Sequence, residues 1–151
     1  MIRNLGKRIA RVTAGLALVA LAGTATARDD KQMYSVAEAL ATPTAEEVIT
    51  GEIQFYFGEG NHPPIERKLG NYQSNKKANG VGRSDEAVCQ RAFLSAMRSL
   101  QDRAVREGGN AVVNIISYYR RNRISSETEF ECGSGAIMSG VTLRGDVVKL
   151  K

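Results

Sequence analysis

The chain has 151 residues, the length of one domain, with 42% hydrophobic and 25% charged residues. Its 21 Lys and Arg outnumber its 16 Asp and Glu, for a formal net charge of +5. Four of the basic residues and none of the acidic ones lie before residue 28, which leaves a nearly neutral remainder of 17 against 16. Such a balance lacks the basicity of a nucleic-acid-binding protein, so nucleic acid is not an expected partner.

Residues 1–27 have the three parts of a secretory signal peptide. Four basic residues come first (Arg3, Lys7, Arg8 and Arg11). An apolar run over 12–22 follows, and small residues precede a polar segment at the Ala27–Arg28 bond. We predict cleavage at that bond and a periplasmic or secreted product. The run is shorter than the roughly 20 residues of a membrane span. The alternative is an uncleaved anchor or a buried helix.

Residues 28–50 are predicted to form an N-terminal lead-in with short helices. The segment 28–34 is polar and is expected to be disordered. Ser35 and Glu38 have the spacing of a capping box, which predicts a short helix that ends near residue 42. A second short helix is expected over 44–49 and should end at Gly51. A single α+β domain is then expected over 51–151.

Two strands and a loop are expected at the start of this domain. Residues 52–57 are rich in Ile, Phe and Tyr and indicate a strand. The sequence His62-Pro63-Pro64 indicates a rigid turn, followed by a more exposed strand over 65–74. The run 74–83 contains two Gly and two Lys and is expected to be a flexible polar loop.

The clearest pattern predicts one main helix, over about 85–107. Ser84 is a good N-cap, and two acidic residues follow it at the positive end of the helix. Apolar residues recur every three or four positions, at Cys89, Phe93, Met97, Leu100 and Ala104. Gly108 and Gly109 are typical of a helix end.

The remaining chain is expected to be strands. Residues 110–119 are continuously apolar and predict a buried strand. Alternation over 127–132 predicts a second strand, with Glu127, Glu129 and Glu131 toward water and Thr128, Phe130 and Cys132 inward. A Gly-punctuated strand over 133–143, a turn at Arg144-Gly145-Asp146 and a last strand over 147–150 complete the pattern. The predicted fold is α+β, with the main helix packed on a small antiparallel sheet.

The two cysteines of the chain are predicted to form a disulfide in the core. Cys89 lies on the apolar stripe of the helix, and Cys132 lies on the predicted buried face of a strand. An isolated cysteine pair in an oxidising compartment is most simply a disulfide. Two reduced thiols are the alternative.

The segments "FYFGEGNHP", "NKKANGVGRSDEAVCQRAF" and "GGNAVVNI…ETEFECGSGAIMSGVTLRGDVVKL" resemble a family of small exported proteobacterial proteins of unknown function. Many of these proteins are labelled "excinuclease ATPase subunit". More distantly, the chain is similar to the Rcs-pathway stress-sensor lipoprotein and to small heavy-metal-binding domains of its fold class. That resemblance implies a compact α+β sandwich and, loosely, a disulfide role for Cys89 and Cys132. The chain lacks the sensor's lipobox cysteine and its second cysteine pair.

The ATPase label conflicts with the sequence. A phosphate-binding loop needs G-x-x-x-x-G-K-[ST], and the chain contains no such string. A zinc-finger set of cysteines is absent as well. We therefore expect neither ATP nor any other cofactor to bind.

Two groups of residues are candidates for function. His62, with Glu59 and Glu66 nearby in sequence, is a weak candidate for a metal or catalytic site, whereas an ordinary turn residue is the alternative. Tyr119, Arg120, Arg121 and Arg123 form a candidate interaction surface at a hairpin tip, or else a solvated turn.

No complete catalytic set is present in the sequence, so the expected function is that of a non-enzymatic binding or interaction module of the cell envelope. Its expected partner is an unknown envelope protein or an anionic envelope component. The alternative function is a small metal-handling protein or an enzyme that uses His62 with Glu59 or Glu66.

Overall fold

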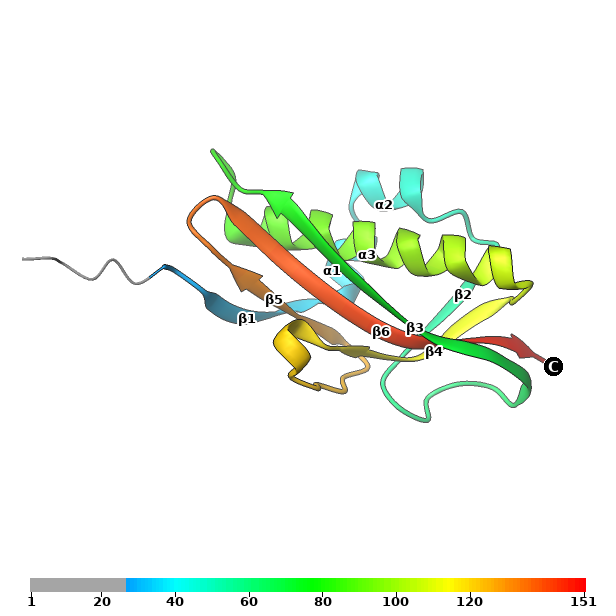
Figure 1. Cartoon of the computed structure of the whole chain (residues 1–151). Helices are drawn as coiled ribbons and strands as arrows, with labels where there is room; N and C mark the ends of the chain where they lie inside the picture. The colour runs from blue at the N-terminus through cyan, green and yellow to red at the C-terminus, as the bar shows by residue number, and fades with distance from the viewer. Residues whose placement is uncertain (1–26) are drawn as a thin grey trace, which may run out of the picture.

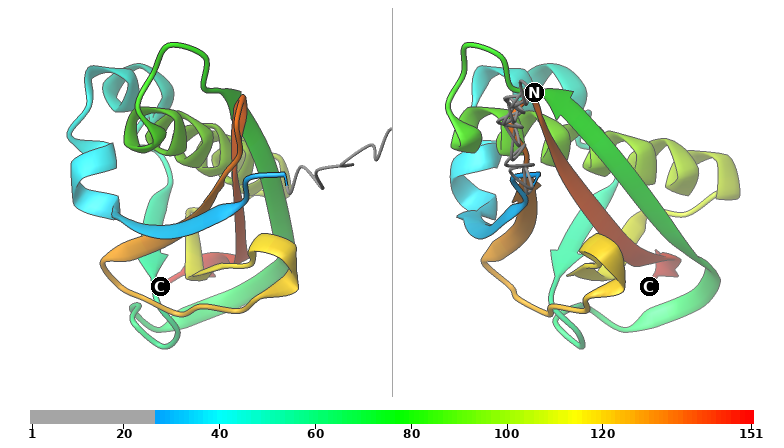
Figure 2. Two further views of the ribbon diagram at one scale, coloured as in Figure 1. Left: turned by 90° about the vertical axis from the view of Figure 1, so that its left-hand side faces the viewer. Right: turned by 60° about the vertical axis from the view of Figure 1, so that its left-hand side comes forward.

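The computed structural model describes residues 27–151, so the predicted signal segment before Ala27 lies outside the described part. One long helix and two short ones lie against one face of a six-stranded sheet, as Figures 1 and 2 show, which confirms the α+β class. The elements are β1 (Asp30–Ser35), α1 (Val36–Leu40), α2 (Pro43–Val48), β2 (Gln54–Phe57), β3 (Ile65–Asn79), α3 (Asp85–Glu107), β4 (Ala111–Ser117), the 3-10 helix η1 (Tyr119–Arg121), β5 (Glu129–Ser134) and β6 (Met138–Leu150).

The main helix, α3, forms where the sequence predicts it. The Ser84 hydroxyl accepts a hydrogen bond from the amide of Ala87, and Gly108 ends the helix in the left-handed conformation. Every residue of the predicted apolar stripe is buried. The Ser35 cap is also confirmed, because its hydroxyl accepts from the amide of Glu38 at 3.2 Å.

The sheet forks at its long central strand, β6. One edge of β6 pairs with β3 along nearly its whole length. The other edge pairs with β5 at only two positions, Gly133 with Gly140 and Ser134 with Ser139, and then with β4 further along. Strand β1 extends the β5 branch, and β2 extends the β4 branch. The β1–β5 branch therefore joins the rest of the sheet through a very short ladder.

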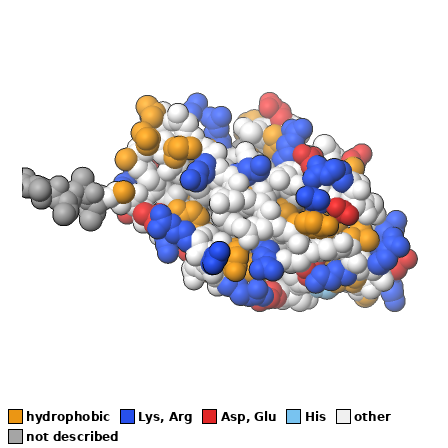
Figure 3. Space-filling view, viewed as in Figure 1, with side chains coloured by type: hydrophobic (Ala, Val, Ile, Leu, Met, Phe, Trp, Pro, Cys, Tyr) orange, Lys and Arg blue, Asp and Glu red, His pale blue; other side chains and the backbone are white. Residues whose placement is uncertain are grey.

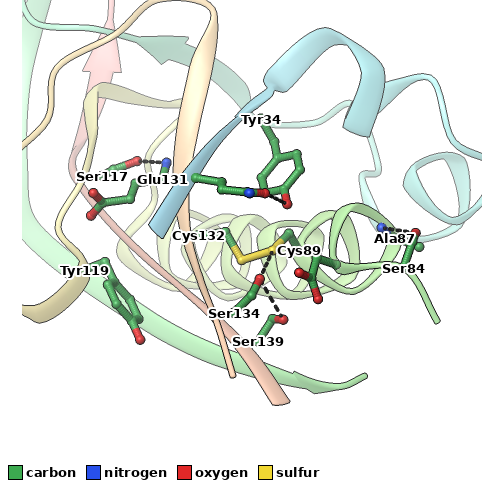
Figure 4. The surroundings of a disulfide bond; sticks show 12 residues. Tyr34, Ser84, Ala87, Cys89, Ser117, Tyr119, Glu131, Cys132, Ser134 and Ser139 are labelled. Carbon is green, nitrogen blue, oxygen red and sulfur yellow. Dashed lines mark hydrogen bonds between the residues drawn. A yellow bond between two sulfur atoms is a disulfide. The ribbon is translucent and has the colours of Figure 1, made fainter. Parts of the chain in front are cut away.

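Contacts with α3 hold this branch in place. The Phe93 ring of α3 stacks on the Phe130 ring of β5, with their centroids 4.1 Å apart. The centroid of the Tyr34 ring of β1 lies 6.0 Å from that of Phe130. The Cys89–Cys132 disulfide joins the same two elements, and both cysteines are fully buried (Figure 4). The predicted disulfide is thus confirmed as a bond of the core.

The sheet is mixed, whereas a purely antiparallel one was expected. Strand β2 runs parallel to β4. Between these two strands the chain passes through β3 and α3, and a long crossover of this kind is what brings a strand back in the same direction. The β3 and β6 pairings are antiparallel, as expected.

The N-terminal segment 28–34 is not a disordered lead-in, because residues 30–35 form β1 and pair with β5. Its polar side chains are mostly exposed, so the sequence shows no inward-facing pattern until Tyr34. Backbone hydrogen bonds to β5 define this strand. Almost any residue can make such bonds, so the amino-acid composition does not reveal them.

Strand β3 continues to Asn79, through most of the predicted loop 74–83. It pairs only with β6, so it is an edge strand of the sheet. Lys76 and Lys77 suit that position, because charged residues on an edge strand prevent pairing with other chains. The Gly and Lys residues of 74–83 are also typical of a polar loop, which is why a loop was predicted there.

Strand β6 is continuous, so the predicted turn at Arg144-Gly145-Asp146 is wrong. The turn of this region lies instead between Ser134 and Met138. Gly145 is needed for close packing, because a Cβ there would lie 2.8 Å from a methyl group of Val112.

Removing the disulfide should loosen the β1–β5 branch before the rest of the sheet. A disulfide between cysteines 43 positions apart adds about 3 kcal/mol to the free energy of unfolding. We expect the double variant Cys89→Ser/Cys132→Ser to lose about this free energy of unfolding in urea. Its amide hydrogens in β1, β5 and 118–128 should exchange faster, whereas those of β3 and β4 change less. Equal acceleration in both branches would contradict the role given to the bridge.

Candidate functional site

The segment that connects β4 to β5, residues 118–128, lies on the sheet face opposite α3 and contains η1. Tyr119 anchors it. The Tyr119 ring packs on Gly133, where a Cβ would lie 2.2 Å from the ring, and its hydroxyl donates to Asp29 at 3.0 Å. Burial and the Asp29 carboxylate raise the pKa of Tyr119. Arg120 pairs with the same carboxylate at 2.8 Å, so the start of the described chain helps to hold η1.

Three residues of this face have positive φ without being glycine: Asn114 (52°), Arg120 (49°) and Arg121 (65°). Left-handed backbone is disfavoured for such residues and is concentrated at functional sites. Asn114 lies where the pairing of β4 with β6 shifts register. The surrounding contacts hold these three conformations in place.

A buried carboxylate, that of Asp146 on β6, lies at the centre of this face. Asp146 is 8% exposed. Its oxygens accept from the amide groups of Asn71 at 2.8 Å and Asn114 at 3.0 Å, and the Lys68 ammonium lies 3.0 Å away. Burial acts to raise the pKa of Asp146, but the three donors outweigh it and hold that pKa below its ordinary value.

A polar hollow of about 210 Å³ opens beside this carboxylate, and we call it the η1 hollow. It is lined by Glu59, Asn71, Asn114, Ile116, Arg123, Arg144 and Asp146. Arg123 and Glu59 form an ion pair across it. The Arg144 guanidinium donates to the side-chain oxygen of Asn71 and lies 5.3 Å from the centre of the Tyr118 ring. The η1 hollow thus offers both hydrogen-bond donors and acceptors.

The predicted interaction surface is divided by the structure. Arg123 lines the η1 hollow, whereas Tyr119 and Arg120 are engaged with Asp29. Arg121 is exposed, and no carboxylate of residues 27–151 lies within 4.0 Å of it. Arg121 is therefore the one arginine of this group without an ion-pair partner among the described residues.

The weak Glu59–His62–Glu66 candidate is not assembled as a site. Glu59 is paired with Arg123, and His62 Nδ1 lies 2.8 Å from the carbonyl oxygen of Pro63. Within residues 27–151, no three His, Cys, Asp or Glu side chains are grouped so that they could hold a metal ion. The structure instead places Glu59 in the η1 hollow.

Glu131 does not point to water as predicted. It is 5% exposed, and one carboxylate oxygen accepts from Asn122 at 3.3 Å. Its amide donates to the Ser117 hydroxyl, as Figure 4 shows. Thr128, expected to face inward, is exposed, because β5 begins only at Glu129.

The candidate residues predicted from the sequence do not include the centre of the site, which consists of Asn71, Asn114, Arg144 and Asp146. One signal was available: Asn114 is the only polar residue within the apolar run from Ala111 to Ile116. A polar side chain in a buried strand needs a hydrogen-bonding partner, and its presence there is a sign of a polar network.

Comparisons with protein-family models, with curated proteins and with solved structures found no match. Among residues 27–151, no helix is both long and apolar enough to cross a membrane.

Replacing the buried carboxylate should make stability less dependent on pH. A depressed folded-state pKa adds stability above the unfolded value of about 3.9, and this stability is lost as the pH falls through the folded-state pKa. We expect Asp146→Asn to lower the free energy of unfolding by about 2 kcal/mol at neutral pH and by less at pH 3. Urea denaturation at both pH values measures this. Glu47→Gln, at an exposed carboxylate of α2, is the control and should change neither value.

Proposed function

We propose that this protein is an exported, non-enzymatic binding module of the cell envelope, and that it recognises a partner protein through the η1 hollow and Arg121. The observation that carries this proposal is a polar hollow beside two arginines that have no carboxylate partner among the described residues. Neither Arg121 nor Arg144 has a carboxylate of the described residues within 4.0 Å. The hydrogen bonds that Asp146 accepts from Asn71 and Asn114 hold the base of the η1 hollow on the sheet.

The chemistry of the η1 hollow favours a polypeptide segment with an acidic side chain. The amide groups of Asn71 and Asn114 bond to Asp146, and Glu59 pairs with Arg123. Arg144 donates to Asn71 but has no carboxylate partner among the described residues. A peptide backbone offers donors and acceptors to match such a mixture. Arg and Tyr side chains are also the types that contribute most to protein interfaces. Tyr118 lies beneath the Arg144 guanidinium.

Three observations support export. The sequence of residues 1–27 has the pattern of a secretory signal. The Cys89–Cys132 disulfide is of the kind that persists in oxidising compartments. The resemblance to small exported proteins points the same way. The mature protein would then begin at Arg28, which pairs with Asp30 and Asp85 and so starts on the folded domain.

Export is tested by the mass of the protein recovered from its native envelope fraction. We expect a mass that corresponds to residues 28–151, with the disulfide formed, so that reduction adds the mass of two hydrogens. Recovery of protein that still begins at Met1 would contradict cleavage. A mass that does not change on reduction would contradict the oxidised state.

Partner recognition is tested by site-specific photocrosslinking in the envelope. A photoreactive residue at position 121 should capture a partner, whereas one at the exposed position 91 of α3 should not. Arg144→Ala should reduce the capture at position 121 about tenfold, since it removes a charge-assisted contact. Equal capture at both positions, or capture that is unaffected by Arg144→Ala, would contradict the proposed surface.

A second pair of variants tests whether η1 must be held in place. Gly133→Ala forces the Tyr119 ring to move, because its Cβ would overlap that ring. Gly80→Ala is the matched control, since the nearest atom to its Cβ lies at an ordinary 3.5 Å. Capture should fall in the first variant and persist in the second, with circular dichroism confirming that both are folded.

A further inference from the structure

A second surface, on the side of the sheet that carries α3, concentrates positive charge. A hollow of about 410 Å³ lies between α3 and the end of β3, and we call it the α3–β3 groove. It is lined by Lys76, Lys77, Ser95, Arg98, Ser99, Asp102 and Arg106. Lys and Arg side chains predominate over Asp and Glu on the face that Figure 3 shows, which includes α3 and β3.

The positive charges of the α3–β3 groove are not neutralised within the described part of the chain. Four cationic residues and one carboxylate line it, although the side chain of Lys77 points to the opposite face of β3 from that of Lys76 and also lines the pocket around Tyr119. Among residues 27–151, none of these five side chains lies within 4.0 Å of an opposite charge. Residues 28–151 carry 17 basic and 16 acidic residues in total, so the surface outside the groove is net negative. The groove is therefore more positive than the rest of the domain.

The groove is held rigid by the fold. Ser95, Ser99, Asp102 and Arg106 follow one another at four-, three- and four-residue steps, which places them along one face of α3. Lys76 and Lys77 come from β3, which pairs with β6 opposite Val141 and Gly140. Because both elements pack on the same core, the backbones that carry these cations keep their relative position.

The groups on the groove define a class of ligand. Ammonium, guanidinium and hydroxyl groups donate hydrogen bonds, and phosphate oxygens accept them. A volume of about 410 Å³ is within the range of small-molecule sites and exceeds the needs of a single phosphate. Asp102, in contrast, repels phosphate but accepts hydrogen bonds from hydroxyl groups. We therefore propose that the α3–β3 groove binds a sugar that carries two or more phosphate groups, with its hydroxyls on Asp102.

The proposal is tested by calorimetric titration of the purified protein with fructose 1,6-bisphosphate at low ionic strength. We expect a Kd below about 1 mM, with no measurable binding of unphosphorylated fructose. Arg98→Gln should weaken binding about tenfold, and Arg91→Gln, on the same helix but outside the groove, should leave it unchanged. Absence of binding, or an equal effect of the two variants, would overturn the proposal.

Asp102→Asn separates recognition of the sugar from simple attraction of phosphate. This variant should weaken the binding of fructose 1,6-bisphosphate and strengthen the binding of tripolyphosphate, which has no hydroxyls to donate and is repelled by the carboxylate. Stronger binding of both ligands would overturn the role given to the sugar. Urea denaturation of each variant shows whether it is folded.

The phosphorylated sugar is either free or the headgroup of a glycolipid, and vesicles distinguish these sources. Phosphatidylcholine vesicles with and without lipid A, a phosphorylated glucosamine glycolipid, serve as probes in a sedimentation assay. Sedimentation that depends on lipid A and is lost in Arg98→Gln supports a headgroup. Binding of fructose 1,6-bisphosphate without such sedimentation supports a free ligand. Sedimentation that Arg98→Gln leaves intact would overturn the assignment of lipid binding to this groove.

Discussion

The junction between α3 and β5 is the contact on which the rest of the structure depends. Because β5 and β6 share only two paired positions, the β1–β5 branch cannot rely on the sheet to fix its place. The Cys89–Cys132 disulfide and the stacked rings of Phe93 and Phe130 fix it instead, by tying the branch to the longest helix. Hydrophobic burial and a covalent bond thus replace the hydrogen-bond ladder that usually holds neighbouring strands together.

This junction also determines the position of the η1 hollow. The segment 118–128 leaves the sheet from the β4 branch and re-enters it on the β5 branch, so it spans the fork. Tyr119 rests on Gly133 of β5 and bonds to Asp29 next to β1, whereas Asn114 and Asp146 belong to the β4 side. The η1 hollow therefore depends on both branches keeping their relative position.

The two proposed surfaces differ in their chemistry. The η1 hollow mixes amides, carboxylates and guanidinium groups around a buried anion, and it suits a partner with both donors and acceptors. The α3–β3 groove is lined mainly by Lys and Arg side chains without ion-pair partners among the described residues, and Asp102 is its one carboxylate.

Local patterns in the sequence determined the elements that are defined by local physics. The capped, amphipathic α3 was predictable because its caps and apolar spacing lie within one segment, and the same holds for the Ser35 cap. Edge strands, the fork and the continuity of β6 through Gly145 were decided only by the tertiary structure, because their hydrogen bonds and close contacts come from distant residues. The same reason explains the sites. The sequence could indicate Arg121 and Arg123 as a basic cluster. Only the fold could bring Asn71 and Asp146, 75 positions apart, within hydrogen-bonding distance of each other.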